Sequence, residues 1–135
     1  MSDFNEQVIA EFRANDGVVG GYFENQTVLL LHNTGAKSGK ERVTPVVTLP
    51  NDEGNYFIIA SAGGSDKHPA WYHNIVANPS VIVEVGTEQF DATARPAEEP
   101  ERTELYEKME AKNPVFTKYK NGTDREIPVI VLEKN

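Results

Sequence analysis

Cysteine is absent from the sequence. Its absence excludes a disulfide framework, thiolate zinc sites, iron–sulfur clusters and a cysteine nucleophile. Long apolar runs are missing too, and none reaches the roughly 18 residues that a membrane-spanning helix needs, so we expect no integral membrane segment. Residues 1–6 have neither the basic nor the apolar stretch of a signal peptide, and we therefore expect a cytoplasmic protein.

Basic residues are also few. The chain has 13 lysines and arginines against 21 acidic residues, a formal net charge of −8. Proteins that track nucleic acid usually carry a basic stripe, so no nucleic-acid partner is expected. Against this background the segment 34–45 is unusual, because it holds Lys37, Lys40 and Arg42 with one acid, Glu41. This segment is either a solvated loop or an anion site.

The usual motifs of metal and nucleotide chemistry are missing as well. The three histidines are His32, His68 and His73, and the last two are five residues apart, which does not place them on one helical face. No metal site is therefore expected. Gly35 and Gly39 have the wrong spacing for a phosphate loop or a dinucleotide fingerprint, and no serine occupies a nucleophile elbow.

The 135 residues correspond to a single domain, 1–135, by length. Periodicity predicts helices over 3–14, 69–78 and 98–112, and strands over 27–32, 42–49, 56–61, 81–85, 89–94 and 127–132. Pro45 makes the second strand an edge or bulged strand. Residues 116–119 are expected in an irregular connection. Short connections then favour an α+β fold with a mostly antiparallel six-stranded barrel, closed or split, and about three helices.

Two segments have the composition of a binding site. Segment 34–45 combines glycines with Lys37 and Arg42, and backbone N–H groups beside such side chains suit a phosphate. Segment 61–74 follows a strand with two glycines and then starts a helix at Pro69, near Lys67 and Trp71. The alternative is two ordinary loops and a core tryptophan. Together the segments suit a flat aromatic ligand with a phosphate tail, such as a flavin-like cofactor.

Three stretches resemble the signatures of the deazaflavin-dependent nitroreductase family of actinobacteria. They are LLLHNTGAKSGKERVTP over 29–45, AGGSDKHPAWYHN over 62–74 and DREIPVIVL over 124–132. The resemblance extends from the first helix to the last strand. It implies a split β-barrel of the flavin-reductase type and a bound deazaflavin, coenzyme F420.

The resemblance also implies which residues contact the cofactor: Lys37, Lys40, Arg42, Thr44, Pro45, Val46, Ser61, Ala62, Gly63, Gly64, Lys67, Trp71 and Asn74. Lys37 and Arg42 would hold the phosphate and the acidic tail. The backbone of 61–64, with Lys67, would line the ribityl and phosphate part, and residues 44–46 would lie along the ring. Residues 71 and 74 would support the ring from the helix.

The substrate side is implied at Val47, Asn113, Phe116 and Tyr119. Members of the family that activate nitroimidazoles are rich in tyrosine here, whereas this chain keeps only Tyr119. We therefore expect hydride transfer from reduced F420 to a quinone, an enone or a related unsaturated or nitro acceptor. Tyr119, Ser61 or water would supply the proton.

Two other functions fit the same residues. One is an FMN-binding reductase of the same fold, and the other is a carrier that binds the deazaflavin without turnover. The partner in each enzymatic case is a small-molecule acceptor, and the chain is expected to be a monomer or a homodimer.

Overall fold

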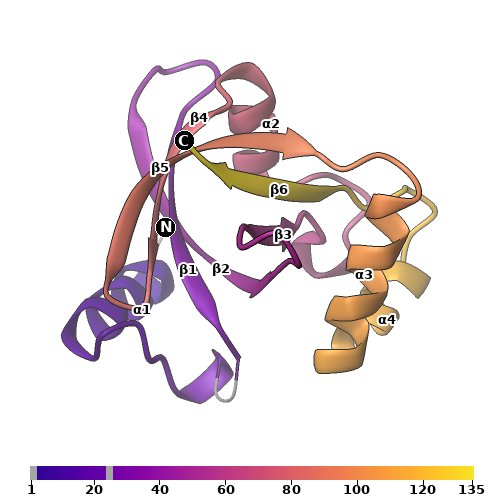
Figure 1. Ribbon diagram of the computed structural model, residues 1–135, viewed down its shortest axis with the longest axis horizontal. Coiled ribbons are helices and arrows are strands. Elements are labelled where there is room, and N and C mark those ends of the chain that lie inside the picture. The colour runs from indigo at the N-terminus through magenta and orange to yellow at the C-terminus, as the bar shows by residue number, and fades with distance from the viewer. Residues whose placement is uncertain (1–2, 24–25) are drawn as a thin grey trace.

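The computed structural model describes residues 3–23 and 26–135. Its helices are α1 (Asp3–Ala14), α2 (Ala70–Ala77), α3 (Glu101–Lys112) and α4 (Val115–Asn121), with short 3₁₀ turns η1 (Gly21–Phe23) and η2 (Ala62–Gly64). Its strands are β1 (Val28–Thr34), β2 (Glu41–Pro50), β3 (Tyr56–Ile59), β4 (Ser80–Val85), β5 (Glu88–Pro96) and β6 (Val129–Lys134). Figure 1 shows the helices arranged around the strands.

The six strands close into one barrel in the order β1-β2-β3-β6-β5-β4, and every neighbouring pair is antiparallel. The predicted α+β class and the six-stranded antiparallel barrel are confirmed. The first three strands form the expected meander, because their short connections permit only hairpin-like pairing. Each strand lies within about three residues of its expected range.

Strand β2 changes its pairing partner along its length. Its first seven residues pair with β1, with Pro45 opposite Leu30, whereas pairing with β3 covers only Thr48 to Pro50. Proline has no N–H to donate, so Pro45 is tolerated where the strand lacks a second neighbour. The expected edge character of this strand is therefore present locally, inside a closed barrel.

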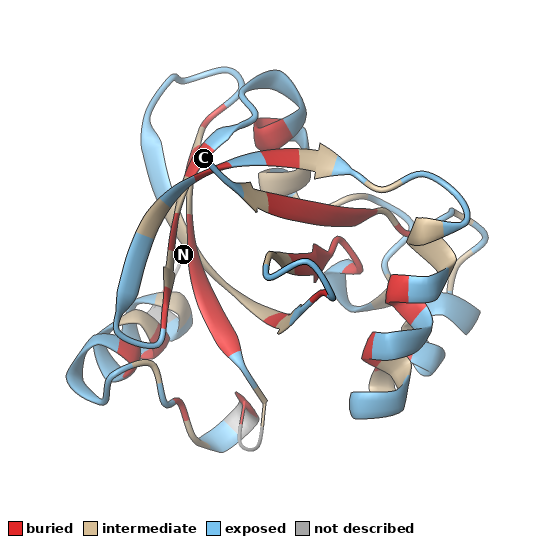
Figure 2. Cartoon of the chain, viewed as in Figure 1, coloured by how far each residue is buried: buried red, intermediate tan, exposed pale blue. Residues whose placement is uncertain are grey.

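The buried side chains form three clusters, and the helices cover different parts of the barrel: α1 contributes to one cluster, α3 and α4 share a second, and α2 contributes to the third. Figure 2 shows that each helix has a buried and an exposed side. Helix α1 packs Val8 and Phe12 near the start of β1. Helices α3 and α4 bury Met109 and Phe116 beyond β3 and β6. This second cluster places α4 beside the part of β2 that has no second strand partner.

Helix α4 corrects one prediction. Residues 116–119 were expected in an irregular connection, but they lie inside a helix that starts directly after Pro114. The segment is short and mostly polar, so its helical period is weak. Its stability comes from packing Phe116 into the second cluster, which periodicity alone does not reveal. Residues 3–23 and 26–135 thus contain four α-helices, where about three were expected.

No helix within 3–23 or 26–135 is both long and apolar enough to span a membrane.

Candidate functional site

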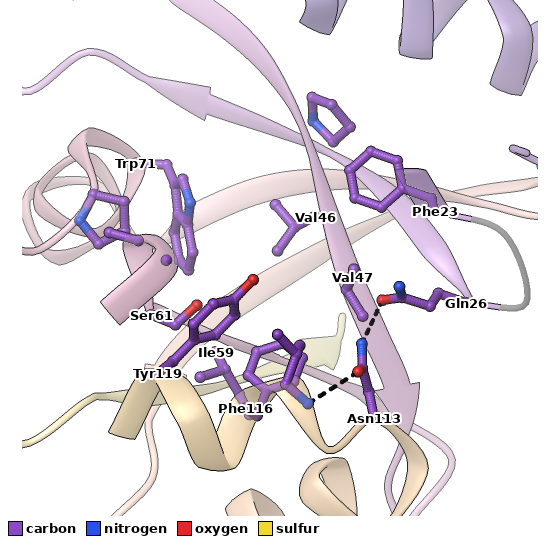
Figure 3. Close-up of a pocket in the computed structure, with 15 residues that line it drawn as sticks. Phe23, Gln26, Val46, Val47, Ile59, Ser61, Trp71, Asn113, Phe116 and Tyr119 are labelled. Atoms are coloured by element: carbon purple, nitrogen blue, oxygen red, sulfur yellow. Dashed lines mark hydrogen bonds between the residues drawn. The ribbon is translucent and has the colours of Figure 1, made fainter. Parts of the chain in front are cut away.

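A cavity of about 330 Å³ lies between β2, the start of α2 and helix α4 (Figure 3). Its walls are mainly apolar and aromatic, with a few polar groups. The lining residues are Phe23, Gln26, Pro45, Val46, Val47, Ile59, Ser61, Ala62, Gly63, Pro69, Trp71, Asn113, Val115, Phe116 and Tyr119. A concave apolar site with few polar groups is the usual form of a pocket for a cofactor or small substrate.

Helix α4 forms one wall and is fixed from behind. The hydroxyl of Tyr106 donates a hydrogen bond to the Phe116 carbonyl oxygen at 2.7 Å. Burial raises the pKa of Tyr106 to about 12, so this hydroxyl keeps its proton. The ring of Phe116 meets that of Tyr119 edge-on, with centroids 5.4 Å apart. Tyr119 thereby points its ring toward Val46 and Trp71.

A close backbone approach fixes the same wall from the η2 side. Gly64 has φ of +84°, and a Cβ placed there would lie 3.1 Å from both the Cα and the carbonyl oxygen of Tyr119. Only glycine permits both this conformation and this distance. Gly64 therefore brings η2 and α4 together.

Arg125 holds the chain between β3 and α2. Its guanidinium donates to the carbonyl oxygens of Ala60, Ser61 and Ser65 at 3.1, 2.7 and 2.8 Å. It also donates to Nδ1 of His68 at 2.9 Å. Burial, and then the charges of Arg125 and His73, lower the pKa of His68. A neutral His68 ring is the form that can accept from Arg125.

The role of Arg125 was missed from sequence. It belongs to the stretch 124–132 that resembles the family, but an isolated arginine before a strand carries no signal of its own. Its hydrogen bonds go to carbonyl groups more than 50 positions earlier in the sequence, and only folding brings these groups next to the guanidinium.

The basic segment lies at the far end of β2. Its turn is closed by hydrogen bonds from Gly35 N to Lys40 O at 2.8 Å and from Gly39 N to Gly35 O at 3.0 Å. The side chains of Lys37, Lys40 and Arg42 are exposed. From Arg42 to Val46 a strand rises about 13 Å, so the cations and the cavity are close enough for one elongated ligand to reach both.

Asn74 joins this basic segment to α2. It is buried, its Oδ1 accepts from Ala36 N at 2.9 Å, and its Nδ2 donates to Asn33 Oδ1 at 2.8 Å. The resemblance implied that Asn74 supports the ring from the helix. Both ends of its amide are instead engaged within the protein, so Asn74 positions the basic turn.

The structure brings ten predicted residues to the cavity wall: Pro45, Val46, Val47, Ser61, Ala62, Gly63, Trp71, Asn113, Phe116 and Tyr119. Seven others lie outside that wall: Lys37, Lys40, Arg42, Thr44, Gly64, Lys67 and Asn74. Five lining residues were missed: Phe23, Gln26, Ile59, Pro69 and Val115. Phe23 and Gln26 precede the first strand in a stretch with no motif, so no sequence signal marked them.

The geometry suits a flat ring system with an acidic tail. The apolar walls with Trp71 and Tyr119 match an aromatic face, while Lys37 and Arg42 offer charge-assisted hydrogen bonds to a phosphate or a carboxylate. This arrangement defines a class of protein: an antiparallel barrel that binds a flavin-like redox cofactor beside a small acceptor.

Comparison with known proteins narrows this class. The family described as F420H(2)-dependent quinone reductase matches residues 5–134, and the chain belongs to that family. It is 38% identical over 129 residues to an F420H(2)-dependent quinone reductase of Mycobacterium tuberculosis, covering 93% of this chain and 86% of the relative.

Two solved structures are similar as well. One, a structure of an F420-H2 dependent reductase, is 41% identical with a TM-score of 0.72, over 78% of this chain and 93% of that one. Another, described as a domain-swapped dimer, is 36% identical with a TM-score of 0.74, over 95% and 96% of the two chains. The predictions of an oxidoreductase, of F420 as its hydride donor and of a quinone as acceptor are confirmed by the family.

Proposed function

We propose that this chain reduces quinones with F420 held in one particular way. The deazaflavin ring would lie in the cavity beside Val46 and Trp71, and the acidic tail would extend along β2 to Lys37 and Arg42. The observation that carries this proposal is that one strand, β2, runs from the apolar cavity to the exposed cations of segment 34–45.

Reduced F420, when bound, supplies the hydride, and the protein's residues orient and shield the reactants. The side chains of Val46, Val47 and Ile59 keep water from one side of the cavity. The hydroxyl groups of Tyr119 and Ser61 are candidates for delivering the proton that the acceptor needs. Val47, Asn113, Phe116 and Tyr119 together would form the acceptor side.

The polar groups on the acceptor side favour quinones and enones over nitro compounds. Asn113 is engaged on both sides of its amide, because it donates to Gln26 Oε1 and accepts from Val115 N. Phe116 offers no hydrogen bond from its side chain. Neither residue is therefore free to orient a nitro group, and a site with few such donors selects acceptors mainly by shape and apolar contact. The split form of the barrel and the wider nitroreductase grouping, both implied by the resemblance, stay predictions.

A panel of acceptors tests the proposal. Steady-state assays with reduced F420 should show reduction of 1,4-naphthoquinone and cyclohexenone, and slow or undetectable reduction of a bicyclic nitroimidazole. Fast nitroimidazole reduction would mean that the acceptor side is misplaced.

A fluorescence titration separates the remaining alternatives. F420 should bind clearly more tightly than FMN. Equal or tighter FMN binding would favour an FMN reductase, and tight F420 binding without turnover of any acceptor would favour a carrier.

A further inference from the structure

Gln26 and Asn113 meet across the wall of the cavity although 87 positions separate them in the sequence. Gln26 lies just before β1, and Asn113 lies between α3 and α4. The Nδ2 group of Asn113 donates a hydrogen bond to Oε1 of Gln26 at 2.8 Å, and both residues line the cavity (Figure 3).

The direction of this hydrogen bond is fixed by the backbone. The N–H of Val115 donates to Oδ1 of Asn113 at 3.2 Å. A backbone N–H can only donate, so the Asn113 oxygen must face Val115 and its NH₂ group must face Gln26. The Gln26 oxygen then accepts, which leaves the Gln26 NH₂ group directed elsewhere.

That NH₂ group is a donor whose direction the Asn113 amide fixes. The indole N–H of Trp71, which also lines the cavity, is a second group that can only donate. Across residues 3–23 and 26–135, no hydrogen bond is donated by the Gln26 NH₂ group. The hydroxyls of Ser61 and Tyr119 also line the cavity, but a hydroxyl oxygen can accept as well as donate. The Gln26 amide cannot reverse without opposing its NH₂ group to that of Asn113.

We propose that the Gln26 NH₂ group donates a hydrogen bond to a carbonyl oxygen of the quinone and thereby selects and orients the acceptor. This inference rests on the proposed function. A quinone oxygen is an acceptor only, so a fixed donor matches it. Reduction transfers a hydride, with its two electrons, from reduced F420 to the quinone, and one proton completes the hydroquinone. Negative charge gathers on the quinone oxygen before that proton arrives, so the same hydrogen bond strengthens as the reaction proceeds.

Two substitutions test the donor in different ways. Gln26→Leu removes the amide at similar size. Asn113→Asp keeps an oxygen for Val115 N–H but turns a second oxygen toward Gln26, so the Gln26 amide should reverse and present its oxygen to the cavity. Gln7→Leu, on the exposed side of α1, serves as the matched control.

The measurement is equilibrium binding of 2-methyl-1,4-naphthoquinone to protein loaded with oxidised F420, which cannot reduce it. Fluorescence of Trp71, the single tryptophan, reports the binding. Both cavity variants should raise the Kd by about threefold to tenfold, the range for one lost neutral hydrogen bond. The control should bind like the unaltered protein.

A hydrocarbon separates donation from packing. 2-Methylnaphthalene has the same rings without the oxygens, so Gln26→Leu and Asn113→Asp should bind it as the parent does. Parental quinone affinity in both variants would overturn the inference, and so would an equal loss of affinity for quinone and hydrocarbon. A quinone loss in Asn113→Asp alone would also overturn it, because Asn113 would then be the contact. Failure of the unaltered protein to reduce any quinone would instead reject the proposed function.

Discussion

The two ends of the proposed site are built on different physical principles. At one end, the exposed side chains of Lys37, Lys40 and Arg42 surround a tight turn. At the other, which we call the cavity end, mainly apolar side chains line a cavity in which the Asn113 amide is engaged on both sides. Exposed cations attract an anion at long range and are screened by salt, whereas packed walls fix distance and orientation. Under the proposed function, the basic end would supply affinity for F420, and the cavity end would orient the reacting groups.

The supporting contacts differ in the same way. The walls of the cavity end are held in place by Arg125, Tyr106 and Gly64. These residues hold η2, α4 and the chain before α2 together. The basic end depends on its own turn and on Asn74. Substitutions at the cavity end should therefore reduce stability as well as activity. Substitutions at the basic end should leave stability unchanged.

Arg125→Met should have the largest effect on stability. It removes hydrogen bonds to three carbonyl oxygens and to His68, and we expect unfolding to become easier by about 2–4 kcal/mol. Denaturant unfolding measures this. Arg102→Met is a matched control, since Arg102 donates twice to Ile127 O at another place. Both variants should lose stability, but only Arg125→Met should also weaken F420 binding. Equal F420 affinity in the two variants would show that Arg125 does not support the cofactor site.

Gly64→Ala should cost more stability than Gly63→Ala. Both glycines have positive φ, +84° and +66°, so both alanines are strained by about 1–2 kcal/mol. A Cβ at Gly63 meets nothing within 4 Å, whereas one at Gly64 presses on the Tyr119 backbone. We expect an additional loss of about 1–2 kcal/mol for Gly64→Ala, by analogy with overpacking elsewhere. Equal losses in thermal or denaturant unfolding would show that the close approach is unimportant.

Lys37→Ala and Arg42→Ala should change affinity without changing stability. A charge-assisted hydrogen bond contributes roughly 1.5–3 kcal/mol, so each variant should bind F420 about 10- to 100-fold more weakly. Added salt should weaken binding to the unaltered protein more than binding to either variant. Lys108→Ala, which loses contacts to Pro50 and Asp52 only, is the control. If calorimetry shows that Lys37→Ala and Arg42→Ala bind F420 as tightly as the parent does, the basic segment is an ordinary solvated loop.

Acid should cause the smallest effect, through His68. The folded-state pKa of His68 is lowered from its ordinary value of 6.5, so the unfolded chain takes up this proton first as the pH falls. The contribution of neutral His68 to stability is complete above that ordinary value and is lost as the pH falls through the folded-state pKa. Unfolding free energies at about pH 7.5 and 5.0 should differ less in His68→Gln than in the parent. An identical pH dependence in the two proteins would contradict this role.

Local patterns predicted much of this structure. The apolar run that forms β1, the short turns and the prolines before α2 and within β2 led to six antiparallel strands in the right places. The family-like stretches also identified residues such as Val46, Trp71 and Tyr119 that share one cavity. Each of these signals lies within a few neighbouring positions.

What could not be predicted depends on contacts between distant segments. Helix α4 is stabilised by packing rather than by its own period, Arg125 acts on carbonyls about 60 positions earlier, and Gln26 gains its orientation from Asn113. Asn74 was expected at the ring from the family resemblance, and the structure shows its amide paired with Asn33 and Ala36. Single-residue patterns carry no information about such partners.

The division of labour between the two ends is tested most directly by steady-state kinetics of Lys37→Ala and Tyr119→Phe with reduced F420 and 1,4-naphthoquinone. Lys37→Ala should raise the KM for F420 about 10- to 100-fold and leave kcat within about twofold, because it removes a contact made equally before and during the reaction. Tyr119→Phe should lower kcat about tenfold or more, with an F420 KM within about twofold of the parent. A Tyr119→Phe variant as active as the parent, or two variants that change the same parameter, would contradict the account.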